Sequence, residues 1–314
     1  MRFAFRRSMM QKYRVIASLI GPILDAGHSL RIHVKGVNFT PNKWRDNPPN
    51  VGQSSKRSIL YIADNFGINV KRIDDVKFTR KKNYNYKRDV LIHMSQQEKN
   101  NFVLPYLVPC CRWKGKKYLT GDPLIELMAK TQKEVNLIPN SMLIIHPGGC
   151  RGFISPWGKP YPKKKTRKNN IEFMNSIAEN IPHWIEHVAI KSHPVPFHQC
   201  TANAMRAYLP YTIVENDLCK AIAQYEWIIN IGSSTAFWLK GSGKKWLNIV
   251  GLAKFKYKFH RENMAKQRGG STHYTKLTQA MENYDRKETQ REKDIFNLPA
   301  TENIMRIINE RISI

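Results

Sequence analysis

Short apolar runs alternate with helix-type segments through the second half of the chain, and this alternation restricts the fold more than any other feature. The apolar runs, which predict strands, lie at 141–145, 187–191, 211–214, 227–231 and 246–250. The segments between them with helical spacing of apolar residues lie at 169–179, 201–207, 217–224 and 235–241. Strands that alternate with helices in this way favour a parallel sheet with helices on both faces.

The first half of the chain opens with a similar alternation. The predicted elements are a strand at Met1–Phe5, a helix at Tyr13–Ala26 that ends at Gly27, and strands at Leu30–Val34, Ser58–Ala63 and Val90–His93. The polar stretch Lys35–Lys56 is predicted to be a long loop. A β-α-β opening of this kind favours parallel pairing of its strands.

With 314 residues the chain is long enough for two domains, each with its own core. We place the boundary between about 120 and 140, where a turn at Gly121 precedes a predicted helix at Leu124–Glu134. The predicted class is α/β, with two Rossmann-like, doubly wound domains facing a central cleft, a common place for a ligand. The first domain spans 1–125, the second spans 140–300, and a helix at 301–314 ends the chain.

The chain is strongly basic, with 52 lysine and arginine residues against 24 aspartate and glutamate residues and a net charge of +28. This excess predicts attraction to polyanions: a nucleotide diphosphate, an anionic membrane surface, an acidic polysaccharide or nucleic acid. Solvated surface lysines without a partner are an alternative explanation for part of the charge. The basic residues gather in several runs rather than in one tail, at Arg80–Lys82, Lys114–Lys117, Lys163–Lys168 and Lys254–Arg268.

The cysteines and the apolar runs favour a cytoplasmic protein. Five cysteines form an odd number without C-x-x-C spacing, which argues against a disulfide framework or a zinc module. His193, His198 and Cys200 could ligate a metal, but a strand end followed by a loop histidine is the simpler interpretation. The apolar runs are too short to cross a bilayer. The basic and then apolar start is interpreted as a strand and a helix rather than a signal peptide, because Pro22 interrupts it.

Two strand ends carry the side chains that point most directly to a ligand. The run Ile228–Ile231 leads into Gly232-Ser233-Ser234-Thr235, and Ile190 leads into Lys191-Ser192-His193-Pro194. In an open α/β sheet, the carboxyl ends of the strands present such groups to the ligand. Serine and threonine can cap the helix predicted at 235–241, whose free N–H groups could hold a phosphate. A capped helix beside a core histidine, with no ligand, is the alternative.

These motifs, in their order along the chain, resemble the carboxyl-terminal domain of GT-B-fold glycosyltransferases, especially those of capsule and surface-polysaccharide synthesis. The segments that carry the resemblance are Lys191–Pro194 with its His-Pro pair, Leu218–Ala223, Trp227–Asn230, Gly232–Ala236 and Gly243-Lys244. Segments similar to further marks of that fold are Ala26–His28, Gly121–Pro123 and Ile144–Gly149, so the resemblance covers most of the chain.

The resemblance implies a nucleotide-sugar donor site on the second domain and an acceptor side on the first. His193 would contact a phosphate or the ribose, while the Ser-Ser pair and its neighbours would bind phosphate. A pair of glycines would let the backbone approach the ligand closely, with an arginine beside it. The predicted donor-binding residues are His193, Pro194, Lys191, Gly232, Ser233, Ser234, Thr235, Gly148, Gly149 and Arg151.

Two positions depart from the family's pattern. Members often carry a glutamate that holds the donor ribose or sugar three residues after the threonine, where this chain has Trp238. We expect Trp238 to be buried against the sheet rather than stacked on a ligand. The proline that usually follows the Gly-Lys pair is Lys245 here. Both changes leave open a family member with altered or lost activity.

An inverting transfer needs a base that takes the proton of the acceptor hydroxyl. The resemblance places this base in the first domain, where Asp64 is the best candidate because it follows the strand predicted at Ser58–Ala63. His93 and Asp25 are further candidates, and a turn or capping role is the alternative for Asp64. The chain has no D-x-D motif, so a metal-independent reaction without a cofactor is expected, with N–H groups and cationic side chains stabilising the leaving group.

The sequence therefore predicts a glycosyltransferase that moves a sugar from a nucleotide-activated donor to a surface-glycan or lipid-linked acceptor. It would be cytoplasmic and peripheral at the inner membrane face, where its basic surface could dock on anionic lipid or an acidic acceptor. Three alternatives stay open: a CDP-polyol phosphotransferase or UDP-sugar epimerase on the same fold, a nucleic-acid-binding protein or DNA-directed glycosyltransferase, and an inactive family member.

Overall fold

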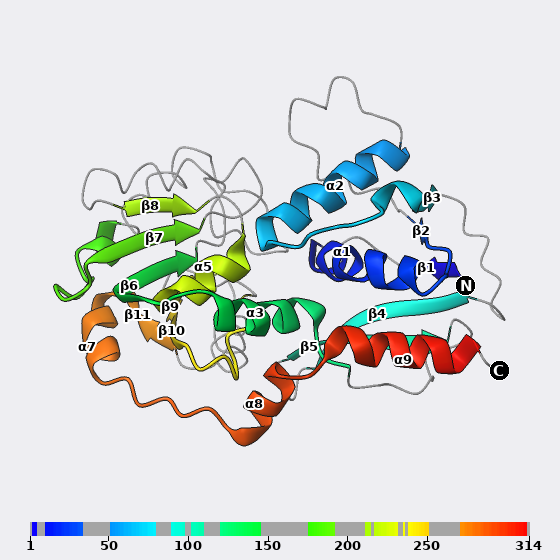
Figure 1. The fold of residues 1–314 in the computed structure, drawn as a ribbon. Helices are drawn as coiled ribbons and strands as arrows, with labels where there is room; N and C mark the ends of the chain where they lie inside the picture. The colour runs from blue at the N-terminus through cyan, green and yellow to red at the C-terminus, as the bar shows by residue number, and fades with distance from the viewer. Residues whose placement is uncertain are drawn as a thin grey trace, which may run out of the picture. The chain divides into compact units, whose positions relative to one another are not determined.

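The chain divides into two compact units in a computed structural model (Figure 1). The first unit consists of Met1–Lys130 together with Ile295–Ile314, and the second of Thr131–Asp294. The structure describes residues 2–4, 10–33, 51–79, 89–97, 102–109, 120–145, 175–191, 211–214, 217–231, 235, 238–250 and 271–312. The four basic runs of the sequence lie outside these residues, whereas acidic and basic residues are nearly balanced within them.

The first unit contains five strands and the helices that surround them in the described part of the chain. The strands are β1 (Arg2–Ala4), β2 (Arg31–His33), β3 (Lys77–Thr79), β4 (Asp89–Gln97) and β5 (Phe102–Pro109). The helices are α1 (Met10–Asp25), α2 (Val51–Phe66), a 3-10 turn at Ile73–Asp75, α3 (Pro123–Glu134), α8 (Gln290–Phe296) and α9 (Ala300–Ile312). Two of them cross between the units, since the end of α3 and the beginning of α8 belong to the second unit.

The strands of the first unit are arranged as in one half of a Rossmann sheet. β2 pairs with β3 and β1 pairs with β4, both in parallel, and β1 also lies beside β2. β5 is antiparallel to β4 and forms the edge. The hydrogen bonds thus form two sheets, β1-β4-β5 and β2-β3. With β1 beside β2, the strands lie in the order β3-β2-β1-β4-β5, which is that of a doubly wound fold with its last strand reversed. The buried face of α1, which includes Ile16, Leu19, Ile20 and Ile23, supplies much of the core.

The strand predicted at Ser58–Ala63 is wrong, because these residues belong to helix α2. Ile59, Ile62 and Ala63 are buried while Leu60 and Asp64 are exposed, which is the period of a helix and not of a strand. The helix starts at Val51, so the loop predicted at Lys35–Lys56 is also wrong over residues 51–56. Residues 35–50 lie outside the described part.

The other predicted elements of this unit are present. The predicted strands at the start, at Leu30–Val34 and at Val90–His93 correspond to β1, β2 and part of β4, and the predicted helices to α1, α3 and α9. Gly27 ends α1 with a positive φ of 78°; its N–H donates to Leu24 O and the His28 N–H to Ile23 O. These two bonds satisfy carbonyls at the helix end and form a Schellman motif.

A second glycine with positive φ holds the last helix in the first unit. Gly121 has a φ of 84°, and a Cβ atom there would lie 3.0 Å from the Cβ atoms of both Leu298 and Ala300 at the start of α9. The next residue, Asp122, caps α3 by accepting the Leu124 N–H at 2.9 Å. The turn therefore has to approach α9 through a residue without a side chain.

A Gly121→Ala variant is expected to lower the free energy of unfolding by about 2–4 kcal/mol, from the positive φ and the overpacking together. Gly27→Ala is the matched control, since it has a φ of 78° but nothing within 4 Å of its Cβ position. That variant should lose only about 1–2 kcal/mol. Denaturant unfolding measures both, and equal losses would show that the approach to α9 does not matter.

The second unit is built on a six-stranded sheet in which every pair is parallel. Its strands are β6 (Ile138–Ile145), β7 (His187–Lys191), β8 (Tyr211–Val214), β9 (Tyr225–Asn230), β10 (Lys245–Val250) and β11 (Ser271–His273), in the order β11-β10-β9-β6-β7-β8. Numbered from β6, this order is 3-2-1-4-5-6, the strand order of a Rossmann fold. The predicted α/β class with two Rossmann-like domains is therefore confirmed.

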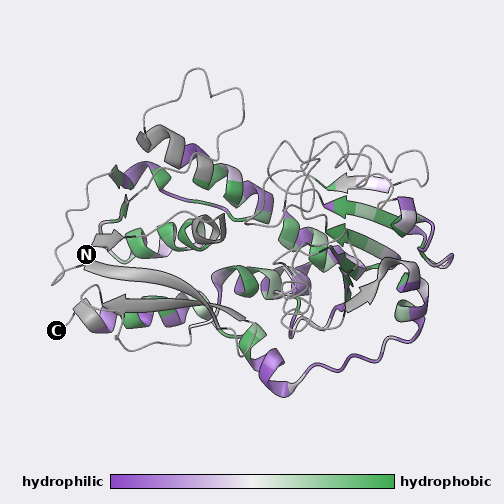
Figure 2. Ribbon diagram, turned by 180° about the vertical axis from the view of Figure 1, so that it is seen from behind, coloured by the Kyte–Doolittle hydropathy of each residue, from purple (hydrophilic) through white to green (hydrophobic). Residues whose placement is uncertain are grey.

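Two different sets of helices cover the faces of this sheet. One face packs Ile144, Ile190 and Ile229 against Leu277 and Met281 of α7 (Leu277–Glu282). The other face meets α5 (Leu218–Gln224), which begins with Asp217 as its N-cap. Figure 2 shows hydrophobic residues along the central strands between these layers. Burial on both faces explains why the strands have continuous apolar runs.

The helix predicted at 235–241 is wrong for the residues that the structure describes. Thr235 begins a short 3-10 turn, in which the Trp238 N–H donates to Thr235 O at 2.9 Å, and turns follow from Trp238 to Ser242. Gly241 and Gly243 both have positive φ, which does not continue a helix. The prediction that the first N–H groups of a regular helix after Ser234 hold a phosphate therefore loses its support.

The remaining connections are described only in part. Residues 175–178 are helical and belong to the helix predicted at 169–179, whereas the helix predicted at 201–207 lies outside the described residues. β11 and α7 were not predicted, because the region from 252 to 295 is polar and basic overall. No helix in the described ranges is long and apolar enough to cross a membrane.

Candidate functional site

The carboxyl ends of β6 and β9 mark the point where the second sheet reverses its winding. From β6 the chain proceeds outward to β7 and β8, and it then returns to the other side of β6 as β9. Ile145 at the end of β6 is paired with Lys191 on one side and with Asn230 on the other. In open α/β sheets, ligands bind in the crevice outside the strand ends at such a switch point.

Three polar side chains are buried in one row across this edge. Lys191 is 3% exposed, Asn230 is fully buried, and Asn248, which is paired with Asn230, is 2% exposed. All three are in register with Ile145. Because successive side chains of a strand point to opposite faces of the sheet, these three lie on the face opposite to Ile144, which is the face that α5 covers. Strands are about 4.8 Å apart, so the backbones of Lys191 and Asn230 are separated by roughly 10 Å.

The row combines a lysine side chain with two side-chain amides. The Asn230 Nδ2 donates to Asn248 Oδ1 at 2.5 Å, which links the ends of β9 and β10. On the other side of β9, the Ile231 N–H donates to Ile145 O at 3.1 Å and extends the contact with β6 by one residue. Of these groups, a lysine ammonium is one that forms charge-assisted hydrogen bonds with a phosphate.

Most of the predicted donor-binding residues follow these strand ends in the chain but lie outside the described residues. The structure describes Lys191, at the end of β7, and Thr235, which is 3% exposed. The other predicted residues are Gly148, Gly149 and Arg151 after β6, His193 and Pro194 after β7, and Gly232, Ser233 and Ser234 after β9. Their parent strands, β7, β6 and β9, are three neighbours in the sheet.

The predicted catalytic residues lie in the first unit. Asp64 is exposed and belongs to the last turn of α2, where its carbonyl accepts the Gly67 N–H, so it does not follow a strand as predicted. His93 belongs to β4 and is paired with Tyr106. Asp25 ends α1 and pairs with Arg72 at 3.1 Å. The structure therefore places these three residues on different elements of the first unit.

Trp238 is buried at 4% exposure, as predicted. It stands at the position where the family resemblance implies a glutamate, and Leu239 beside it is fully buried. An indole enclosed in this way belongs to the packing of the β9–β10 connection. The sugar-binding role of the glutamate therefore has no counterpart at this position.

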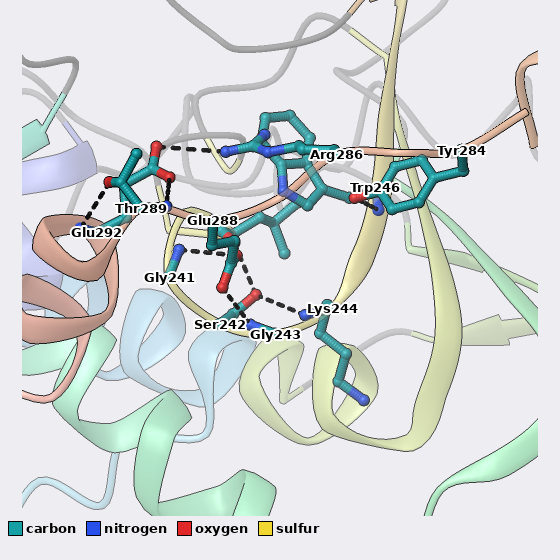
Figure 3. A network of polar contacts seen from close by, with 11 residues as sticks. Gly241, Ser242, Gly243, Lys244, Trp246, Tyr284, Arg286, Glu288, Thr289 and Glu292 are labelled. Carbon is teal, nitrogen blue, oxygen red and sulfur yellow. Dashed lines mark hydrogen bonds and ion pairs between the residues drawn. The ribbon is translucent and has the colours of Figure 1, made fainter.

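The Gly243-Lys244 pair belongs to a polar network at the opposite edge of the sheet, shown in Figure 3. The carboxylate of Glu288 accepts the N–H groups of Gly241 at 2.9 Å and of Gly243 at 3.0 Å. The Lys244 Nζ donates to Ala223 O at 2.6 Å and to Tyr225 O at 3.1 Å, at the amino end of β9. Lys244 therefore fastens the end of α5 to the loop before β10.

The same network anchors the segment that leads to α8. The Trp246 N–H donates to the Tyr284 hydroxyl at 3.3 Å, and the Arg286 guanidinium lies over the Trp246 ring at 4.3 Å. Thr289 and Glu292 exchange hydrogen bonds in a capping box at the start of α8. These contacts explain the conformation of residues 241–246 without any ligand.

Burial lowers the pKa of Lys244 to about 8, although Glu226 raises it in part. The unfolded chain therefore keeps this proton to a higher pH than the folded chain, and the unfolding free energy should rise between about pH 8 and pH 10.5. A neutral amine keeps two N–H groups, so both carbonyl bonds survive deprotonation.

A Lys244→Met variant should lose this pH dependence. Relative to the variant, the native protein is expected to gain about 1–2 kcal/mol of stability between pH 8 and pH 10. Denaturant unfolding of both proteins across this range measures the difference and cancels the titration of other groups. Parallel pH profiles would contradict the lowered pKa.

Asn230 and Asn248 are the residues of the candidate site that sequence analysis missed. Each is the one amide in an otherwise apolar end of a strand, in the runs Trp227–Asn230 and Trp246–Val250. A single amide within an apolar run that is buried on both faces of the sheet could have pointed to these two residues. Among the described residues, no group of three or more His, Cys, Asp or Glu side chains could hold a metal ion.

Neither models of known protein families nor curated proteins match the chain. Among solved structures it is similar to UDP-GlcNAc 2-epimerase from Neisseria meningitidis bound to UDP-GlcNAc, with 9% identity and a TM-score of 0.43 over 100% of both chains. It is also similar to MurG from Acinetobacter baumannii, with 11% identity and a TM-score of 0.43 over 98% of this chain and 99% of that one. For the E. coli heptosyltransferase WaaC with ADP, the identity is 10% and the TM-score 0.34 over 99% and 100%. These are likenesses of fold and say nothing about the reaction.

Proposed function

We propose that the protein is a glycosyltransferase whose second unit holds a nucleotide-sugar donor at the carboxyl edge of its parallel sheet. The observation that carries the proposal is the buried Lys191 at this edge, one strand away from the switch point between β6 and β9. A lysine ammonium forms charge-assisted hydrogen bonds with phosphate oxygens, which the diphosphate of a nucleotide sugar supplies.

The residues that follow the three neighbouring strands support the same site. β6 is followed by Gly148 and Gly149, β7 by His193, and β9 by Ser233 and Ser234. Glycines allow a close backbone approach, and hydroxyl, imidazole and N–H groups donate hydrogen bonds to phosphate oxygens. In this proposal Lys191 and His193 contact the diphosphate, and the residues after β9 complete its binding.

The proposed reaction transfers the sugar to an acceptor hydroxyl while the nucleoside diphosphate leaves. Negative charge develops on the diphosphate in the transition state, so the cation at Lys191 would stabilise the leaving group. A base in the first unit would take the acceptor proton, with Asp64 and His93 as candidates. The acceptor is proposed to be a surface glycan or a lipid-linked sugar.

Thermal unfolding in the presence of nucleotides tests the donor site. A bound nucleoside diphosphate at 100 times its Kd should stabilise the protein by about 2.7 kcal/mol. We expect one of UDP, CDP, ADP or GDP to raise the Tm, and His193→Ala to abolish the rise. His187→Ala is the matched control, because His187 is exposed at the amino end of the same strand.

Turnover of the nucleotide that binds then tests the chemistry. Nucleotide sugars built on that base are expected to be hydrolysed slowly without an acceptor, with release of the nucleoside diphosphate. Epimerisation of the sugar, or release of CMP from a CDP-polyol, would replace the glycosyltransferase proposal by one of these two reactions. A protein whose Tm responds to no nucleotide would contradict the donor site itself.

A further inference from the structure

Asn230 and Asn248 form a buried amide pair at the edge where the proposed donor site lies. They stand directly opposite each other on the parallel strands β9 and β10, at 0% and 2% exposure. The residues before them on the same strands, Ile229 and Leu247, are buried and apolar. A pair of amides therefore follows buried apolar residues on both strands.

Stability alone does not explain this pair. Burying two amide groups has a desolvation cost that hydrogen bonds have to offset. Two apolar side chains of the same shape can be equally stable or more so. The pair is better explained by geometry, because a hydrogen bond of 2.5 Å between Asn230 Nδ2 and Asn248 Oδ1 fixes the lateral spacing of two strand ends.

The pair lies at the end of β9, where the strand is also bonded to β6. Asn230 is the last residue of β9, and the next residue, Ile231, donates its N–H to Ile145 O of β6. The end of β9 is thus held by a side-chain bond on the β10 side and by a backbone bond on the β6 side. The chain continues from this point into Gly232, Ser233 and Ser234.

We infer that Asn230 and Asn248 are positioning residues, which fix the end of β9 at the switch point. They act through the strand end and not by contact with the ligand. The link to the ligand rests on the proposed function, which places a nucleotide diphosphate at this end of β9. Correct spacing at this point matters because hydrogen bonds to phosphate weaken steeply with poor geometry.

Three variants separate positioning from simple packing. The double variant Asn230→Leu/Asn248→Leu replaces the amide pair by hydrocarbon of similar size. The single variant Asn248→Leu removes the Oδ1 acceptor of Asn230 and should have a lower Tm than the double variant. Ile228→Val is the control, because it loosens the same face of β9 two residues earlier without touching the pair.

Two readouts are measured on each folded protein: hydrogen exchange of the Ile231 amide, and the Kd of the nucleoside diphosphate that raises the native Tm. For the double variant we expect exchange at Ile231 and the Kd to rise at least tenfold each, with neither changed in Ile228→Val. Unchanged exchange at Ile231 would overturn the inference. Faster exchange with an unchanged Kd would overturn its link to the ligand.

Failure of the proposed function gives a different result. If no nucleoside diphosphate binds to the native protein, the donor site is refuted. The Ile231 exchange rate then decides by itself whether the pair fixes the end of β9. Faster exchange in the double variant supports the positioning role, and unchanged exchange rejects it.

Discussion

A Trp238→Glu variant is expected to lose most of its folded population. This substitution introduces the glutamate that the family resemblance implies at this position, and it removes an indole that is 4% exposed. Loss of a buried tryptophan and burial of an unpaired carboxylate together should lower the free energy of unfolding by about 5 kcal/mol or more. Because whole domains are stable by about 5–15 kcal/mol, the loss should be visible without denaturant.

Circular dichroism and denaturant unfolding measure this effect. Trp238→Phe is the matched variant, since it keeps an apolar ring and should lose far less stability. A folded Trp238→Glu protein with near-native stability would show that the position faces solvent or a ligand. In that case the buried environment of Trp238 would be wrong, and a sugar-binding role would return.

A Lys191→Met variant is expected to fold and to lose nucleotide affinity. Methionine is unbranched and similar in length to lysine, so the substitution removes the charge with little loss of packing. A hydrogen bond to a charged group contributes about 1.5–3 kcal/mol, so the Kd for the nucleoside diphosphate should rise roughly 10- to 150-fold. Isothermal titration calorimetry measures the change.

Lys244→Met is the control for this variant. Lys244 is a partly buried lysine of the second unit, but it bonds to Tyr225 O at the amino end of β9, away from the strand end that bears Lys191. Its loss should leave nucleotide affinity unchanged. Equal losses of affinity in the two variants would mean that the effect comes from general stability or overall charge.

The second sheet could be predicted from the sequence because parallel strands buried on both faces have continuous apolar runs. The runs at 141–145, 187–191, 211–214, 227–231 and 246–250 all lie within strands β6 to β10 or extend one residue beyond them. The strand order could not be predicted, since no local pattern records which strands pair. β11 was missed because Ser271–His273 has no apolar run.

The two wrong predictions, a strand at Ser58–Ala63 and a helix at 235–241, both concern short segments whose composition fits more than one structure. The residues of α2 from Ser58 to Ala63 are apolar enough to suggest a strand. The helix extends over the more polar residues before them, back to Val51, which the apolar run by itself does not indicate. In the β9–β10 connection, Trp238 and Leu239 suggested a helix, but the positive φ of Gly241 and Gly243 and the bonds to Glu288 set a turn. Glu288 lies about fifty residues further on, so this tertiary contact could not be predicted locally.

Of the three buried polar residues of the candidate site, the sequence predicted Lys191 but not Asn230 and Asn248. Lys191 was singled out because it ends an apolar strand and stands two residues before a His-Pro pair. Asn230 and Asn248 were not, because their significance comes from the register that sets them opposite each other on β9 and β10. Charge also gave little guidance, since the basic runs lie outside the described elements.

A nucleoside diphosphate is proposed to bind at the carboxyl edge of the second sheet, and a hydrogen-exchange footprint tests this binding. Exchange is measured along the native chain with and without UDP, CDP, ADP or GDP at saturation. We predict slower exchange at the ends of β6, β7 and β9, around Ile145, Lys191 and Ile231. No footprint with any of the four nucleotides, or one confined to the opposite edge around Lys244 and Glu288, would contradict the claim.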